Sequence, residues 1–136
     1  MKRVFIDTSA WYAYFLREDP AHDAVRDAFF EWEGRLVTSN FIFDELVTLC
    51  QMRLGHAAAM KVGEALRDEA SVELVRLSSD DEDEAWSWFG RHRDNKFYYT
   101  DCSSFVLMRR LRIPIAVATD HHFQQAGFQV RPRLIG

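Results

Sequence analysis

Cysteine and long apolar runs are both scarce in this sequence. Only two of its 136 residues are cysteines, and a disulfide-stabilised scaffold or a four-ligand zinc site would need more. The apolar run Val4–Ile6 ends at Asp7, and no later uncharged apolar stretch approaches the roughly 18 residues of a membrane helix. We therefore expect a cytoplasmic protein that neither enters nor crosses a membrane.

The sequence also lacks an excess of positive charge. Its 17 Lys and Arg residues stand against 21 Asp and Glu, and the formal net charge of −4 argues against nucleic-acid binding by bulk charge. The charge is unevenly distributed, however. Residues 1–84 hold nine basic and 18 acidic side chains, whereas residues 85–136 hold eight basic and three acidic ones. The last third of the chain is therefore basic, and Asp101 and Asp120 are two of its three acids.

Composition and length indicate a folded domain. Hydrophobic residues make up 48% of the chain and charged residues 28%, which is typical of globular proteins and excludes a disordered or low-complexity chain. A length of 136 residues falls within the usual size of one domain. With no repeat or linker in the sequence, we expect a single domain over residues 1–136.

Short apolar runs alternate with longer segments of helical period. The runs predict strands at 3–6, 36–38, 72–77 and 115–118 and from 128 onward. Helices are expected after Ser9, over 20–32, 40–54, 56–70 and 100–111, from Ser78 and just before Gly127. Such alternation implies parallel strands joined by right-handed crossovers, so the expected fold class is a three-layer α/β sandwich with a mainly parallel five-stranded sheet.

Local signals refine these helices. Asp19 followed by Pro20 predicts a helix start, and Ser39 predicts a cap for the helix that stops at Gly55. In the helix after Ser78, Trp86 and Phe89 are expected on the apolar side.

Four acids differ from the others because they follow or lie within apolar sequence. Asp7 follows Val4–Ile6, Glu45 lies within Phe41–Leu49, Asp101 stands beside Cys102, and Asp120 follows Ile115–Ala118. Ligands of parallel sheets gather beyond the carboxyl ends of the strands, where Asp7 and Asp120 are expected. Any one of these acids alone is better explained as a helix cap or a strand-end hydrogen-bond acceptor. Together they predict an acidic site.

An acidic site of this kind calls for a cation. Two carboxylates about 4 Å apart repel each other by about 4 kcal/mol at an effective dielectric constant near 20, so the group must take up protons or bind a metal ion. Oxygen ligands without cysteine or histidine favour Mg²⁺ or Mn²⁺ over zinc. Such an ion supports phosphodiester hydrolysis by water, with no nucleophilic side chain.

Four stretches of the chain, in this order, resemble the PIN-domain ribonucleases and especially the VapC-type toxins. They are Val4–Trp11, Ser39-Asn40 leading to Asp44-Glu45, Tyr99–Met108, and Thr119–Phe128. The resemblance covers nearly the whole chain. It implies a Mg²⁺- or Mn²⁺-dependent endoribonuclease that acts on an RNA substrate, forms a homodimer and is neutralised by a cognate antitoxin. It also implies that the metal-holding acids are Asp7, Glu45, Asp101 and Asp120.

One residue departs from the family pattern. Tyr98 lies two residues before the Thr100-Asp101 pair, where the family often has a small polar residue such as serine. A bulky ring there would alter access to the metal or the contact between subunits.

Further residues are candidates for supporting roles. Thr8, Ser9 and Thr119 lie next to the strand-end acids, where they would hydrogen-bond an acid or a phosphate, or act as helix caps. The basic residues that flank the Asp101 segment are candidates for an RNA-guiding rim, because a carboxylate pocket repels phosphate; they are Arg91, Arg93, Lys96, Arg109, Arg110 and Arg112. The pair His121-His122 is expected at the surface, since adjacent helical residues point about 100° apart and do not share an ion.

Other functions fit the sequence less well. A phosphatase of the haloacid dehalogenase type would need a second acid where Ser9 stands, and a receiver domain would need an acidic pair after its first strand. Two PIN-like alternatives remain: an RNA-processing nuclease without a toxin role, and a non-catalytic module that binds RNA or protein.

Overall fold

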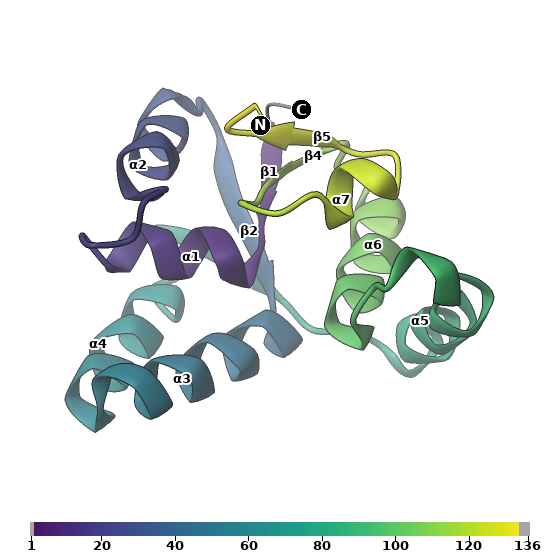
Figure 1. Ribbon diagram of the computed structural model, residues 1–136, viewed down its shortest axis with the longest axis horizontal. Helices are drawn as coiled ribbons and strands as arrows, with labels where there is room; N and C mark the ends of the chain where they lie inside the picture. The colour runs from purple at the N-terminus through teal and green to yellow at the C-terminus, as the bar shows by residue number, and fades with distance from the viewer. Residues whose placement is uncertain (1, 134–136) are drawn as a thin grey trace.

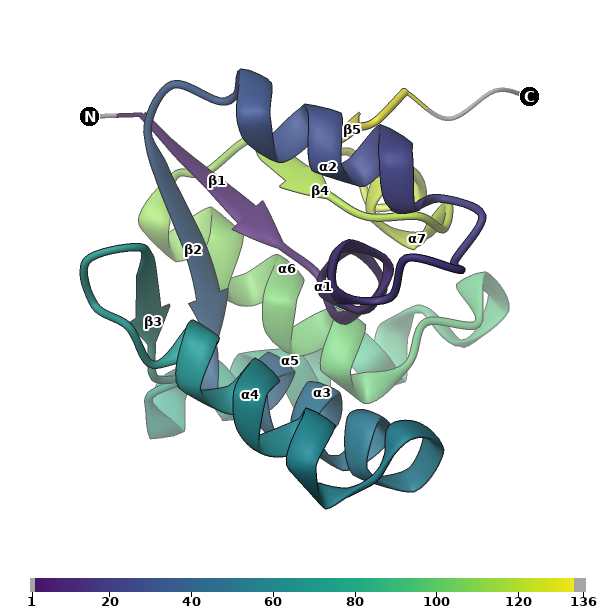
Figure 2. The ribbon, with the colours of Figure 1, turned by 90° about the vertical axis from the view of Figure 1, so that its left-hand side faces the viewer.

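The computed structural model describes residues 2–133 and shows a parallel sheet between two layers of helices (Figures 1 and 2). Its strands are β1 (Arg3–Ile6), β2 (Arg35–Ser39), β3 (Val72–Val75), β4 (Ile115–Val117) and β5 (Gln129–Arg131). They lie in the order β3-β2-β1-β4-β5, and every neighbouring pair is parallel. The expected three-layer α/β sandwich with a five-stranded sheet is confirmed.

Seven α-helices connect the strands of the described chain. They are α1 (Thr8–Phe15), α2 (His22–Glu31), α3 (Asn40–Leu54), α4 (His56–Leu66), α5 (Ser79–Arg91), α6 (Tyr99–Leu111) and α7 (His122–Gln125), and a 3₁₀ turn spans Arg93–Asn95. Helices α1 to α4 lie on one side of the sheet and α5 to α7 on the other (Figure 1). None of the described helices is long and apolar enough to span a membrane.

The strand order explains this division of the helices. The chain moves outward from β1 through β2 to β3, then crosses back to β4 on the other side of β1. Because crossovers between parallel strands are right-handed, the reversal of direction puts the later helices on the opposite face. The order reverses between β1 and β4, and ligands of such sheets bind beyond the carboxyl ends at this point. Asp7 follows one of these strands directly, and Asp120 lies shortly after the other.

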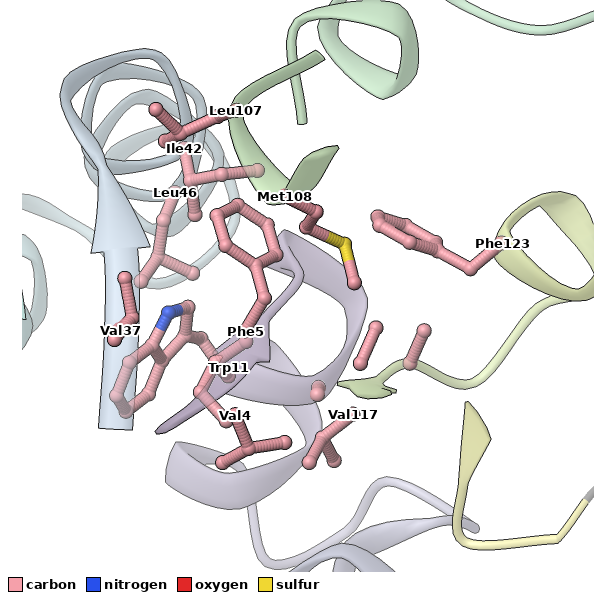
Figure 3. Close-up of a cluster of buried hydrophobic side chains, with 14 of the residues drawn as sticks. Val4, Phe5, Trp11, Val37, Ile42, Leu46, Leu107, Met108, Val117 and Phe123 are labelled. Carbon is pink, nitrogen blue, oxygen red and sulfur yellow. The ribbon is translucent and has the colours of Figure 1, made fainter. Parts of the chain in front are cut away.

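The core is built around the central strand. Val4, Phe5 and Ile6 of β1 are fully buried, as expected for a strand covered by helices on both faces. Figure 3 shows the Phe5 ring among side chains from α1, α3, α6 and α7. The indole N–H of Trp11 donates to the Thr38 hydroxyl at 3.2 Å, so α1 is fixed to β2 by a polar contact within this core.

Two helix boundaries differ from the sequence expectation. The helix expected from Pro20 begins at His22, because Asp19 Oδ1 accepts the N–H of Ala21 at 2.8 Å and holds the preceding residues in a turn. The helix expected to reach residue 70 ends at Leu66. There Asp68 accepts the Ala70 N–H at 3.2 Å, which again favours a turn over another helical turn.

Strand β3 is also shorter than expected. It ends at Val75 rather than Leu77, because the N–H of Leu77 donates to the side chain of Asn40 at 2.9 Å instead of to a strand. Asn40 is the first residue of α3, so this bond attaches the chain after β3 to the start of that helix.

The sequence prediction of which side of α5 is buried is wrong. Ala85 and Trp88 are the residues that face the core, whereas Trp86 is 66% exposed and Phe89 is 38% exposed. Trp86 and Phe89 stack on each other at 5.9 Å, and each ring lies 6.2 Å from the ring of Tyr99 on α6. We call these three rings the aromatic cluster. The helix has two apolar stripes, and only packing against α6 decides which one is buried.

Candidate active site

Asp7 occupies the junction between β1 and α1. It is 5% exposed, and its backbone N–H donates to the carbonyl of Val117 at the end of β4. Its Oδ2 atom accepts the backbone N–H of Ser9 at 3.2 Å and the Ser9 hydroxyl at 2.7 Å. Asp7 is thus the N-cap of α1, and the switch point of the sheet sets its position.

Burial makes the negative charge of Asp7 unfavourable. Loss of hydration raises the pKa of Asp7 to about 7, against an opposing effect of the Ser9 hydroxyl and with further contributions from the charges of Asp120 and Asp101. Near neutral pH this carboxyl is therefore ready to exchange its proton for another cation.

Asp101 is held in the first turn of α6, which begins at Tyr99. It is 6% exposed, and its Oδ2 atom accepts the backbone N–H of Tyr98 at 2.9 Å. Burial raises the pKa of Asp101, the Tyr98 N–H and the nearby His122 lower it, and the charges of Asp120 and Glu45 raise it again. Asp101 therefore serves as a helix cap while it shares an acidic environment with residues from other elements.

Asp120 and Glu45 are more open to solvent. The Asp120 side chain is 42% exposed, and its Oδ1 atom accepts the backbone N–H of His122 at 3.0 Å. Glu45 is exposed on α3 and lines a groove of about 590 Å³ together with Asn40, Phe41, Asp44, Thr48, Leu49, Met52 and Thr100. This groove runs between α3 and the start of α6, so it opens beside the turn that carries Asp101.

The four acids influence the pKa values of Asp7 and Asp101 in pairs. The charges of Asp101 and Asp120 act on Asp7, and those of Asp120 and Glu45 act on Asp101. Each aspartate has one oxygen fixed by a neighbouring donor. The other oxygens, Oδ1 of Asp7 and Asp101 and Oδ2 of Asp120, accept no hydrogen bond from the described residues.

These unpaired oxygens suit a hard divalent cation, which prefers carboxylate ligands. Within residues 2–133, no three Asp, Glu, His or Cys side chains lie grouped so that they could hold a metal ion as they stand. Two properties of the site suit a divalent cation: the candidate ligands are carboxylates, and the pKa of Asp7 is raised by burial. A bound cation would offset the cost of burying the negative charge of Asp7.

The small polar residues have distinct positions. The hydroxyl of Ser9 donates to Asp7 and accepts the backbone N–H of Thr119 at 3.1 Å. Ser9 therefore links the residues that follow β1 and β4. The hydroxyl of Thr8 is buried without a hydrogen-bond partner among the described residues. The link of Thr119 to the site runs through its backbone N–H.

The candidate basic residues lie near both ends of α6. Arg91, Arg93 and Lys96 are exposed near the loop that leads into α6. Arg109 lies at the other end of that helix, about 12 Å along its axis from Asp101, with its guanidinium 4.3 Å from the centre of the Trp88 ring. Arg110 forms an ion pair with buried Asp81 at 2.9 Å, so it stabilises the contact between α5 and α6.

His122 is a residue that sequence reasoning missed. Both histidines of the pair were expected at the surface, and His121 is exposed as expected. The His122 side chain is only 22% exposed, and its Nδ1 atom lies 2.8 Å from Asp101 Oδ2. The position of His122, two residues after Asp120 and directly before the buried Phe123, was the available signal.

Comparisons with known proteins agree with this architecture. Residues 4–129 match the family model of the PIN domain. The chain is 35% identical over 130 residues to the 23S rRNA-specific endonuclease VapC20 of Mycobacterium tuberculosis, and the match covers 95% of this chain and 98% of that protein. It is 30% identical over 121 residues to Ribonuclease VapC26 of the same species, covering 88% of this chain and 89% of the relative.

Solved structures show the same fold. The crystal structure of Mycobacterium tuberculosis VapC20, described as a sarcin-ricin loop cleaving toxin, matches with a TM-score of 0.87 and 33% identity over 92% of this chain and 95% of that one. A chain of a toxin-antitoxin complex from Klebsiella pneumoniae matches with a TM-score of 0.72 at 14% identity, covering 97% of this chain and 99% of that one. The latter likeness shows the fold alone.

Proposed function

This chain belongs to the PIN-domain family, and from this membership we propose that it is a divalent-metal-dependent endoribonuclease, the toxin of a toxin-antitoxin pair. The observation that supports the proposal is the burial of Asp7 and Asp101, whose pKa values are raised by burial and by the charges of neighbouring site acids. Buried carboxylates of like charge, each with an unpaired oxygen, are costly unless a cation binds. We regard the whole chain as one nuclease domain.

The residues that would hold the metal ion are Asp7, Asp101 and Asp120, with Glu45 from α3. A divalent ion bound there supplies an activated water and neutralises charge on the scissile phosphate. Ser9 and the N–H of Tyr98 each fix one oxygen of a buried aspartate, which leaves the other oxygen without a competing donor.

We assign Mg²⁺ or Mn²⁺ as the metal. The four candidate ligands are all carboxylates, and hard oxygen donors favour these ions over zinc. The two cysteines are buried, and burial raises the pKa of Cys102 to about 11 and that of Cys50 above its ordinary value, which makes both thiols poor metal ligands.

The substrate we propose is the sarcin-ricin loop of 23S rRNA. VapC20, which resembles this chain over nearly its full length, is named for cleavage of that RNA. Arg91, Arg93 and Lys96, exposed before the start of α6, would attract the phosphates of the RNA, and Arg109 would contact it farther along α6.

The partners we propose are a cognate antitoxin and a second copy of this chain. Structures of toxin-antitoxin complexes share the fold, and the aromatic cluster leaves apolar rings exposed on α5. We place the protein in the cytoplasm, where its RNA substrate is found.

Cleavage of a sarcin-ricin loop RNA by the purified protein tests the function. We expect cuts with Mg²⁺ or Mn²⁺ and none with EDTA. The products should carry 5′-phosphate and 3′-hydroxyl ends, because water rather than the ribose 2′-hydroxyl attacks. Asp80→Asn, which changes an exposed acid of α5, is the matched control and should cut normally. Cleavage in EDTA or a 2′,3′-cyclic phosphate product would reject the metal mechanism.

A further inference from the structure

His122 contacts two of the four site acids through two different atoms. Its backbone N–H donates to Asp120 Oδ1 at 3.0 Å, and its ring Nδ1 lies 2.8 Å from Asp101 Oδ2. The same Nδ1 lies 3.9 Å from Asp120 Oδ1. His122 thus joins the first turn of α6 to the loop after β4, two segments that are remote in the sequence.

The surroundings of the ring leave Nδ1 no other partner. Nδ1 is shielded from solvent, and no described residue forms an aligned hydrogen bond with it. The ring stands nearly perpendicular to Phe97 at 6.0 Å and edge-on to Tyr98 at 5.6 Å, so aromatic rings restrict its orientation. The 2.8 Å approach of Nδ1 to Asp101 Oδ2 is therefore a close polar contact that is not aligned as a hydrogen bond, and because carboxylate oxygens only accept, a hydrogen on Nδ1 is the tautomer that such a contact suits.

The contact also selects which oxygen of Asp101 stays open to a ligand. Oδ2 is approached by His122 and by the N–H of Tyr98, whereas Oδ1 has no donor among the described residues. On Asp120 the backbone of His122 occupies Oδ1 and leaves Oδ2 without one. One residue therefore constrains the orientation of two carboxylates at once.

We propose that His122 is a positioning residue that holds the carboxylates of Asp101 and Asp120 in place for the metal ion. This inference rests on the proposed nuclease function, which supplies the metal. Neighbours that orient metal ligands typically change metal affinity or activity by about 10- to 100-fold when they are removed. His121, adjacent in the sequence but exposed, is a matched control.

Binding of Mn²⁺ without RNA tests the role directly. Electron paramagnetic resonance measures how much Mn²⁺ is bound. We expect His122→Leu to weaken Mn²⁺ binding by about 10-fold or more. His122→Asn should recover much of this loss, because its amide nitrogen can donate from near the position of Nδ1. His121→Leu should bind as the wild type does. Unchanged Mn²⁺ affinity in a folded His122→Leu protein would overturn the proposal.

The spectrum of the bound ion separates positioning from direct ligation. A positioning role predicts no imidazole nitrogen coupling to Mn²⁺. A nitrogen coupling that disappears in His122→Leu would show that the histidine binds the metal itself, and would overturn the role assigned here.

A metal-free measurement separates this inference from the proposed function. In ¹⁵N NMR spectra of the imidazole rings, Asp101→Asn should shift the His122 signals and leave those of His121 in place. A His122 ring that does not respond would reject the contact, even if the wild type cuts RNA. A protein that shows the contact and binds Mn²⁺ but cuts no RNA would reject the nuclease function alone.

Discussion

The Ser9 hydroxyl donates to Asp7 Oδ2 at 2.7 Å, the shortest of the hydrogen bonds described at the acidic site. The Ser9 oxygen in turn accepts the N–H of Thr119 at 3.1 Å. Because Ser9 lies on α1 and Thr119 follows β4, one side chain connects the two sides of the switch point. The position of Asp7 therefore depends on a residue that is itself attached to the strand next to it.

Ser9→Ala should weaken both the site and the fold. Loss of the hydroxyl removes a contact that lowers the pKa of Asp7, so this pKa should rise further. The N–H of Thr119 also loses its acceptor, at a cost of about 1 kcal/mol in the free energy of unfolding. RNA cleavage should fall by about 10-fold or more. Ser9→Thr, which keeps the hydroxyl, is the control, and equal activity of the alanine and threonine variants would contradict the role.

Asp101→Asn should leave a folded protein that no longer cuts RNA. Asparagine still accepts the Tyr98 N–H through its amide oxygen, so the first turn of α6 should persist. Because burial disfavours the charge of Asp101, the free energy of unfolding of the metal-free variant should equal or exceed that of the wild type. Catalysis should fall by orders of magnitude, since an anionic ligand is lost. Full activity of the folded variant would refute this assignment.

The stability of the metal-free protein should fall between about pH 4 and 7. Burial raises the pKa of Asp7 from 3.8 to about 7, so the folded state keeps a proton that the unfolded state releases. The contribution of Asp7 to the free energy of unfolding is therefore most favourable near pH 4. It decreases by at most about 4 kcal/mol as the pH rises to 7.

Denaturant unfolding of the wild type and of Asp7→Asn in EDTA checks this pH dependence. The substituted asparagine cannot titrate, so the variant should gain stability relative to the wild type as the pH rises. A difference that is constant from pH 4 to 8 would show that Asp7 has an ordinary pKa.

Arg110→Met should lower stability through Asp81. Burial raises the pKa of Asp81, but hydrogen bonds from Arg110 and Ser78 outweigh this and hold it below its ordinary value. Removal of the guanidinium leaves Asp81 only its cap on α5, and the loss should be about 1 to 2 kcal/mol, since Arg110 is partly exposed. The loss is measured by comparing the thermal unfolding of Arg110→Met with that of Arg91→Met, which changes an exposed arginine. Equal melting temperatures would mean that the pair contributes nothing.

Light scattering at micromolar concentration should give about twice the 15.9 kDa mass of the chain. The expected interface consists of the exposed apolar side chains Met52 and Leu54 of α3 and the aromatic cluster, so Trp86→Ser should weaken the dimer. Phe30→Ser removes another exposed ring, which lies on α2, and should leave the dimer intact. A wild type found only at 15.9 kDa would contradict the dimer.

Much of the fold was predictable because local patterns and global topology agree. The apolar runs, the cap at Ser39 and the stop at Gly55 are local signals, and Gly55 has the positive φ of 97° that favours glycine. The predicted start of α2 and the predicted end of α4 are wrong because the side chains of Asp19 and Asp68 stabilise local turns instead of helix.

By itself, the sequence determined the fold class and named the four acids, because each follows or lies within apolar sequence that has to be buried. Only the tertiary structure decided which neighbours those acids meet. The contact of His122 with Asp101, the pairing of Arg110 with Asp81 and the burial of Trp88 instead of Trp86 all join segments that are distant along the chain or depend on which helix face is covered. Residue type and spacing carry no record of such contacts, since side-chain partners are set by how the helices pack on the sheet.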